Sequence, residues 1–148
     1  MKITICGSLY FIDEIMRAKV ELEKLGHSVE TPPTEVPGEN GQPIPVAEMY
    51  VIYKNAKADD AWVWKNRERA MNNHNRKIEY AEAVLIMNLE KNGVAGYIGS
   101  NTLLEMGLAF YLGKKIYLFA PVPDQPAKEE LLGMHPSVIN GDLSKLCF

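Results

Sequence analysis

The chain alternates between short apolar runs, typical of buried strands, and longer segments in which apolar residues recur at helical spacing. Strands are predicted at residues 2–6, 27–30, 83–87, 115–120 and 137–139. Helices are predicted at residues 12–25, 47–56, from about 59 to 81, 101–112 and 128–132, with a tail or last turn at 142–148. We therefore expect one α/β domain over residues 1–148, a three-layer sandwich around a parallel four- to five-stranded sheet in flavodoxin-like or Rossmann-like order.

The stretch 96–109 is a glycine-bearing turn that runs into an apolar helix carrying one acid, Glu105. In open α/β sheets a ligand usually sits beyond the carboxyl ends of the strands, where such a turn meets a helix. If Asn101 or Ser100 caps this helix, Glu105 lies near the face that looks into the crevice. The alternative is that Glu105 is a capping-box partner or complements the helix dipole.

A second turn, Gly7-Ser8, ends the first predicted strand. With the usual right-handed crossover, the first two strands are parallel. The turns at Gly7-Ser8 and Gly99-Ser100 should therefore open on the same edge of the sheet.

Residues 31–45 contain five prolines and two glycines, a composition that resists both helix and strand. Loops of this length inside compact domains are often lids or binding loops. We predict a mobile flap near the site. The alternative is a surface loop without contact to a ligand.

The helical segment 46–81 carries several candidate binding residues. Its aromatic residues could stack on a base, although such residues more often fill a core or an interface: Tyr50, Tyr53, Trp62 and Trp64. Its basic residues are interpreted as a solvated face, with phosphate attraction as the minor alternative: Lys65, Arg67, Arg69, Arg76 and Lys77. His74 and Glu79 could donate protons.

Composition narrows the possible partners. With 47% hydrophobic and 24% charged residues, the chain is an ordinary globular protein. A formal net charge of -3 disfavours a polynucleotide partner but allows a small anionic ligand. No apolar run reaches the ~18 residues of a membrane span, and the amino terminus is too short an apolar run for a signal peptide. We expect a cytoplasmic protein with no membrane partner.

Cys6 and Cys147 lack the paired spacing of a metal site or redox motif, and Cys6 is expected to be a reduced thiol in an apolar strand. The G-x-G-x-x-G fingerprint and the P-loop lysine pattern are absent. Hydride transfer and nucleoside-triphosphate hydrolysis are therefore rejected, and neither cofactor nor metal is expected.

Three segments resemble the nucleoside 2-deoxyribosyltransferase-like superfamily, which includes the 5′-deoxyribonucleotide N-glycosidases. They are the opening I-C-G-S at residues 5–8, the A-x-A-V-L-I strand at 81–86, and Y-I-G-S-N-T-L-L-E-M-G-L-A followed by G-K-K-I-Y-L-F at 113–119. The E-x-G-x-A element at residues 105–109 is the most specific part. The resemblance spans most of the chain and is weakest over residues 31–45 and the Trp-bearing helix.

The resemblance implies a small-molecule partner, a nucleoside or nucleotide, whose N-glycosidic bond is attacked by Glu105 to form a glycosyl-enzyme intermediate. Gly7, Ser8, Gly99 and Ser100 would offer backbone and hydroxyl donors to a 5′-phosphate or sugar, with Asn101 beside them. It also implies a homo-oligomer.

The chain departs from the superfamily pattern at two acids: His74 stands where transferases place one aspartate, and Ser100 where they place another. These departures put base exchange in doubt and leave open hydrolysis, a non-catalytic nucleotide-binding or sensing domain, or a fold that serves only as an assembly partner. His74 is the predicted proton donor to the leaving base, with Glu79 a weaker candidate.

Overall fold

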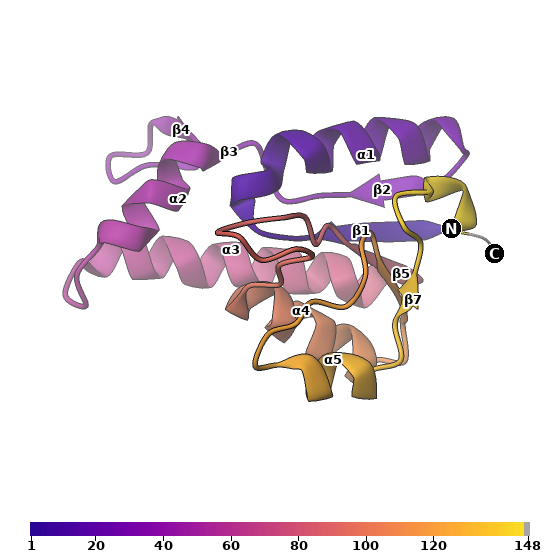
Figure 1. The fold of residues 1–148 in the computed structure, drawn as a ribbon. Coiled ribbons are helices and arrows are strands. Elements are labelled where there is room, and N and C mark those ends of the chain that lie inside the picture. The colour runs from indigo at the N-terminus through magenta and orange to yellow at the C-terminus, as the bar shows by residue number, and fades with distance from the viewer. Residues whose placement is uncertain (147–148) are drawn as a thin grey trace.

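The structure, a computed structural model, describes residues 1–146 (Figure 1). Its main sheet has five parallel strands in the order β2-β1-β5-β6-β7. These strands are β1 (Lys2–Cys6), β2 (Ser28–Glu30), β5 (Ala83–Ile86), β6 (Lys115–Leu118) and β7 (Ser137–Val138). In this order the first strand of the chain, β1, lies between the second and third strands of the main sheet, β2 and β5. This is the predicted flavodoxin-like arrangement.

Helices cover both faces of this sheet, as predicted. One face carries α1 (Ile12–Lys24) with the short 3-10 helices η1 (Leu9–Phe11) and η2 (Leu143–Lys145). The other carries α3 (Ala61–Tyr80), α4 (Ser100–Tyr111) and α5 (Lys128–Gly133), as Figure 1 shows. Helix α2 (Val46–Asn55) projects from the end of the sheet where β1 finishes. Residues 147 and 148 of the predicted tail, including Cys147, lie outside the described residues.

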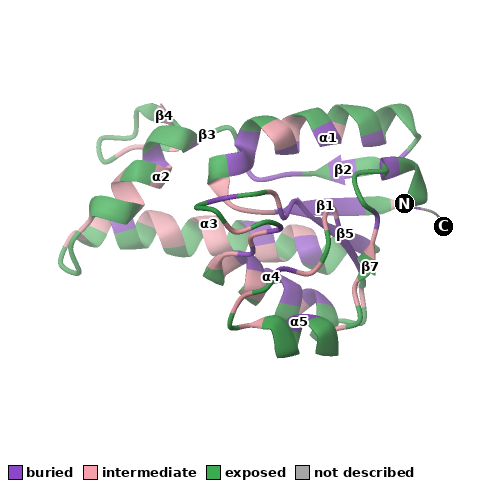
Figure 2. Cartoon of the chain, viewed as in Figure 1, coloured by how far each residue is buried: buried purple, intermediate pink, exposed green. Residues whose placement is uncertain are grey.

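The core splits into two layers because side chains alternate along each strand. Ile3 and Ile5 of β1 point to the α1 face, whereas Cys6 joins the layer under α3 and α4. Strand β5 is buried along its whole length, which fits its central position (Figure 2). Cys6 is therefore directed toward the helix that carries Glu105.

The prediction that residues 31–45 resist strand formation is wrong. They contain an antiparallel hairpin of β3 (Glu35–Pro37) and β4 (Pro43–Pro45). The Gly38 N–H donates a 2.7 Å hydrogen bond to the Gln42 carbonyl oxygen, and the Val46 N–H donates one of 2.8 Å to the Thr34 carbonyl oxygen. Bonded and non-bonded pairs alternate along an antiparallel ladder, so the prolines of both strands fall on the intervening, non-bonded pairs. Their missing N–H groups cost the hairpin nothing.

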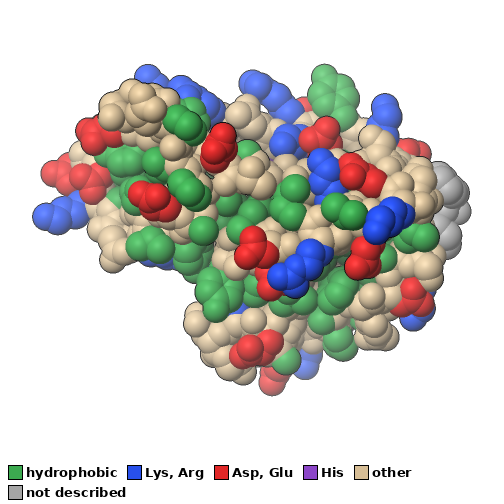
Figure 3. All heavy atoms as spheres, turned by 90° about the horizontal axis from the view of Figure 1, so that it is seen from above, with side chains coloured by type: hydrophobic (Ala, Val, Ile, Leu, Met, Phe, Trp, Pro, Cys, Tyr) green, Lys and Arg blue, Asp and Glu red, His purple; other side chains and the backbone are tan. Residues whose placement is uncertain are grey.

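The predicted capping of α4 is also wrong. Gly99 is the N-cap residue, no side chain caps the helix, and Ser100 and Asn101 are its first two residues. The turn before it needs glycine at position 96, where φ is +70° and a Cβ would lie 2.6 Å from the Pro121 carbonyl oxygen. Acidic and basic side chains are interspersed on the face seen in Figure 3. None of the described helices is long and apolar enough to cross a membrane.

Candidate functional site

A cavity of about 280 Å³ lies at the carboxyl end of the sheet, between the two glycine-bearing turns. All seven residues predicted for the site line it: Gly7, Ser8, His74, Gly99, Ser100, Asn101 and Glu105. The parallel pairing of β1 with β5 explains this convergence, because it brings the ends of distant strands to one edge. The structure therefore brings the predicted residues together, while their chemical roles stay predictions.

The flap and α2 form the outer wall of the cavity. Pro32, Pro33 and Val36 line it from the hairpin segment, and Tyr50 and Tyr53 line it from α2. The flap thus lies next to the site as predicted, although its mobility stays a prediction.

Asn66 on α3 fastens this outer wall to the body of the molecule. Its Nδ2 donates a 2.7 Å hydrogen bond to the Pro37 carbonyl oxygen, and its Oδ1 accepts one of 2.6 Å from the Tyr53 hydroxyl. One side chain therefore holds both the hairpin and α2 against α3.

Glu105 lies in the second turn of α4 with its side chain 7% exposed. Asn101 Nδ2 donates a 2.8 Å hydrogen bond to Glu105 Oε1, whereas Oε2 has no hydrogen-bond partner among the described residues. Burial raises the pKa of Glu105 to about 7, opposed by Cys6, Arg67 and Asn101. The carboxyl is therefore close to half-ionised near neutral pH, and it is not a capping-box acid.

His74 on α3 faces Glu105, with Nε2 3.9 Å from Glu105 Oε1. Its side chain is 7% exposed, and neither ring nitrogen has a hydrogen-bond partner among the described residues. Burial and, to a lesser extent, the positive charge of Lys77 lower the pKa of His74 to about 4. The Ile5 backbone opposes this shift. The ring is thus neutral near pH 7, and between about pH 4 and pH 7 the pair's one titratable proton resides on Glu105.

Glu79, the weaker predicted donor, is exposed and does not line the cavity. Its carbonyl oxygen accepts a 2.8 Å hydrogen bond from Lys114 Nζ on the far side of α4. It is therefore not placed to reach a ligand in this cavity.

Lys91 is a site residue that the sequence did not reveal. Its ammonium group donates to the hydroxyls of Tyr50 at 2.6 Å and Ser8 at 3.3 Å. It also lies 4.9–5.2 Å from the ring centroids of Tyr10, Tyr50 and Tyr97. The residue is buried and lines the cavity, but no acid among the described residues forms an ion pair with it. An anion entering the cavity would supply that missing negative charge.

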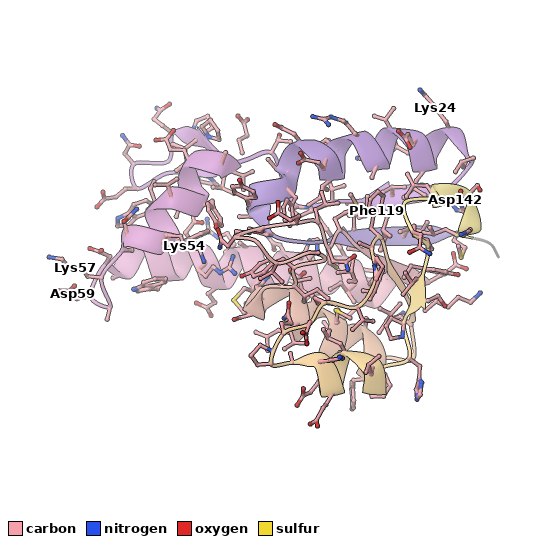
Figure 4. All side chains as sticks on the ribbon, viewed as in Figure 1. Lys24, Lys54, Lys57, Asp59, Phe119 and Asp142 are labelled. Atoms are coloured by element: carbon pink, nitrogen blue, oxygen red, sulfur yellow. The ribbon has the colours of Figure 1, made fainter. Side chains whose placement is uncertain are left out.

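Two more cations line the cavity wall. The Arg67 guanidinium lies 5.1 Å from the Tyr53 ring centroid, and the Lys54 ammonium lies 5.3 Å from that of Tyr50. Figure 4 shows Lys57 and Asp59 at the outer tip between α2 and α3, away from the cavity that Lys54 lines. The interpretation of Arg67 as part of a solvated face is therefore wrong.

The aromatic residues of segment 46–81 also divide into some that line the cavity and some that do not. Tyr50 and Tyr53 line the cavity, whereas Trp62 and Trp64 do not. Trp64 is 37% exposed and donates a 2.8 Å hydrogen bond to the Lys57 carbonyl oxygen. Only the tyrosines are thus placed to contact a ligand.

The turn leading into α4 is braced by two side chains. Asn88 Nδ2 donates to the carbonyl oxygens of Ala120 and Pro121 at 3.0 and 3.2 Å, and its Oδ1 accepts from the Ala120 N–H at 2.9 Å. The Gln125 amide exchanges hydrogen bonds of 3.1 and 2.9 Å with the backbone of Ile98. These bonds fix the position from which Gly99 starts α4.

One group of buried side chains, two of which line the cavity, has the composition of a metal site. Donor atoms of Cys6, His74 and Glu105 all lie within 4.8 Å of one another, and all three residues are buried.

The α/β fold, with its sheet in the order β2-β1-β5-β6-β7, is similar to that of a solved enzyme structure. A solved structure of a 2-deoxyribosyltransferase from the psychrotolerant bacterium Bacillus psychrosaccharolyticus superposes with a TM-score of 0.52. The two chains are 19% identical over 82% of this chain and 73% of the other. No family model and no curated protein matches the chain by sequence.

Proposed function

We propose that the protein cleaves or transfers the N-glycosidic bond of a (deoxy)nucleoside or nucleoside 5′-monophosphate, with Glu105 as the nucleophile. The observation that carries this proposal is the Glu105 carboxyl at the cavity floor between the two turns, with Oε2 without a partner among the described residues. The likeness of the fold to a deoxyribosyltransferase supports it.

In the proposed reaction Glu105 Oε2 bonds to the anomeric carbon of the sugar as the bond to the base breaks. The bonding electrons leave with the base, which takes up a proton. Asn101 holds Oε1, so that Oε2 is directed at the sugar. Water then hydrolyses the glycosyl ester, or a second base displaces Glu105 from it.

His74 is the proposed carrier of the proton. Transfer of the proton from Glu105 to His74, between pKa values of about 7 and about 4, yields a nucleophilic carboxylate and an imidazolium in one step. Three pKa units cost about 4 kcal/mol. A turnover of about 10 s⁻¹ corresponds to a barrier of about 16 kcal/mol, which leaves room for this cost.

Three cations support a 5′-phosphate on the substrate. Lys91 with Ser8 offers an ammonium and a hydroxyl to one anion, and Arg67 and Lys54 add positive charge to the same cavity. Ser100 suits a phosphate better than an acid would, because it brings no negative charge. Glu105 is the one acid among the residues that line this cavity.

The second candidate is a non-catalytic nucleotide-binding or sensing domain. The neutral state of His74 favours it, because an uncharged imidazole is a poor proton donor to a leaving base. It would use the same cations and the same cavity.

Incubation with a panel of nucleosides and nucleoside 5′-monophosphates, with detection of free base, separates the two candidates. We expect base release by the wild type and by Glu79→Gln, a matched control outside the cavity, but not by Glu105→Gln. Tight binding of a nucleotide without base release would favour the non-catalytic domain.

A further inference from the structure

Three different metal-binding groups from three elements meet at one end of the cavity, where His74 and Glu105 line it and Cys6 lies buried behind them. Cys6 ends β1, His74 lies in α3, and Glu105 lies in α4. One donor atom from each lies within 4.8 Å of the other two.

These groups are poorly satisfied by the protein itself. Both ring nitrogens of His74 and Oε2 of Glu105 lack hydrogen-bond partners among the described residues. Buried polar atoms without partners are unusual and cost about 1–3 kcal/mol each. His74 Nε2 points toward the carboxylate at 3.9 Å rather than toward another donor or acceptor. A ligand that accepts lone pairs from both side chains would remove this cost.

We propose that Cys6, His74 and Glu105 bind a Zn²⁺ ion, with the fourth coordination position open to the cavity. Thiolate, imidazole and carboxylate are the three ligand types that zinc takes in proteins, at about 2.3 Å for sulfur and about 2.0–2.2 Å for nitrogen and oxygen. Tetrahedral donors at these lengths lie about 3.3–3.6 Å apart. The most separated pair would therefore close by roughly 1 Å.

Binding releases protons. Burial raises the pKa of the Cys6 thiol well above its usual value, so the thiol enters the site protonated. On coordination the thiol gives its proton to solvent, Glu105 gives up its proton where it carries one, and His74 binds as the neutral ring. Asn101 continues to orient the carboxylate through Oε1.

The consequence for activity rests on the proposed function. A carboxylate that coordinates zinc is not available to the anomeric carbon, so zinc acts as a reversible inhibitor. The ion also occupies the His74 nitrogen that would otherwise take up the proton for the leaving base. Metal binding itself is independent of whether the protein turns over any nucleotide.

Titration of metal-stripped protein with Co²⁺, a spectroscopic substitute for Zn²⁺, tests the site directly. We expect one equivalent to produce a thiolate-to-cobalt charge-transfer absorption, and one equivalent of Zn²⁺ to abolish it. The absorption should persist in Cys147→Ser, which removes the other thiol, and vanish in Cys6→Ser. His74→Ala should weaken uptake at least about tenfold. Circular dichroism of each variant checks that it is folded.

No stoichiometric uptake by the folded wild type, or an unchanged charge-transfer absorption in folded Cys6→Ser, overturns the inference and leaves the proposed function standing. In an active preparation, Zn²⁺ should inhibit base release, and a chelator should restore it. Activation by Zn²⁺ would overturn the inhibitory role. Absence of turnover in metal-free protein would instead count against the proposed function alone.

Discussion

His74 Nε2 lies 3.9 Å from Glu105 Oε1 in a pair of side chains that are each 7% exposed. Burial reverses the usual order of the two pKa values, because it raises the pKa of Glu105 to about 7 and lowers that of His74 to about 4. Between about pH 4 and pH 7 the pair therefore holds one proton, on the carboxyl, and it loses that proton as the pH rises through 7.

The first prediction concerns the pH dependence of base release in metal-free buffer. Because the reacting state needs one proton on the Glu105 and His74 pair, kcat/KM should be level between about pH 5 and pH 7 and fall about tenfold per pH unit above 7. Steady-state rates between about pH 5 and about pH 9 would measure this profile. A rate that rises through pH 7 and then levels off would mean that the leaving base takes its proton from another source, against the proposed role of His74.

The second prediction concerns Glu105→Gln and stability. A carboxyl whose folded pKa is raised from 4.5 to about 7 binds its proton more tightly when folded, so the wild type loses stability as pH rises through that interval. Glutamine does not titrate. The free energy of unfolding of the variant relative to the wild type should therefore increase by about 3 kcal/mol between pH 4.5 and pH 7 and then stay constant.

Urea denaturation of both proteins at matched pH measures this difference. His74 is present in both, so its own titration, which destabilises the fold as pH falls from 6.5 toward 4, largely cancels. A difference that does not vary with pH would show that Glu105 is not buried as described.

The third prediction concerns Lys91→Met. Loss of a charge-assisted hydrogen bond costs about 1.5–3 kcal/mol, so kcat/KM for a nucleoside 5′-monophosphate should fall roughly ten- to hundredfold, and much less for the matching nucleoside. Lys65→Met, on the exposed part of α3, is the control and should change neither. Equal losses for both substrates would argue that Lys91 supports the cavity rather than a phosphate.

The fourth prediction compares two glycines. Gly96→Ala meets both a left-handed φ of +70° and the Pro121 carbonyl oxygen at 2.6 Å, so it should destabilise the protein by about 1–3 kcal/mol. Gly107 lies within α4 and an added Cβ there contacts nothing within 4 Å. Gly107→Ala should stabilise by about 0.5–1 kcal/mol. Thermal unfolding of the two variants measures both effects, and a tolerated Gly96→Ala would contradict the described turn.

The fifth prediction concerns assembly. The homo-oligomer expected from the sequence has a candidate interface on the outer side of α4, where the exposed large side chains are apolar and Glu105, the helix's charged residue, faces inward. Leu104 is 62% and Tyr111 is 85% exposed there. If copies of the chain pair through this face, Leu104→Lys should yield monomer in light scattering, while Leu132→Lys on α5 should not. Monomeric wild type would remove the oligomer prediction.

Much of the fold could be predicted because parallel strands buried on both faces give unbroken apolar runs, as in β5. The same logic placed the turns at Ser8 and Ser100 at one edge. The hairpin at 35–45 could not be predicted, because what permits its prolines is their position on the ladder rather than their number.

The site was harder to predict where it depends on tertiary contacts. In the sequence Lys91 is an ordinary loop lysine, and only the fold brings tyrosines from three separate segments around it. The approach of Cys6 to His74 and Glu105 depends on which face of β1 carries the thiol, and no spacing along the chain encodes it. Arg67 likewise differs from its exposed neighbours only by its place on the helix facing the cavity.

The two hydrogen bonds of Asn66 affect how a ligand could enter the cavity. Swinging the hairpin and α2 away from α3 breaks both of its hydrogen bonds together, at a net cost of about 1–3 kcal/mol. These two bonds alone would favour the shut conformation over the open one by roughly five- to 150-fold. A small molecule could still enter on the millisecond timescale of hinge motions, while bulk water would be kept from Glu105 for most of the time.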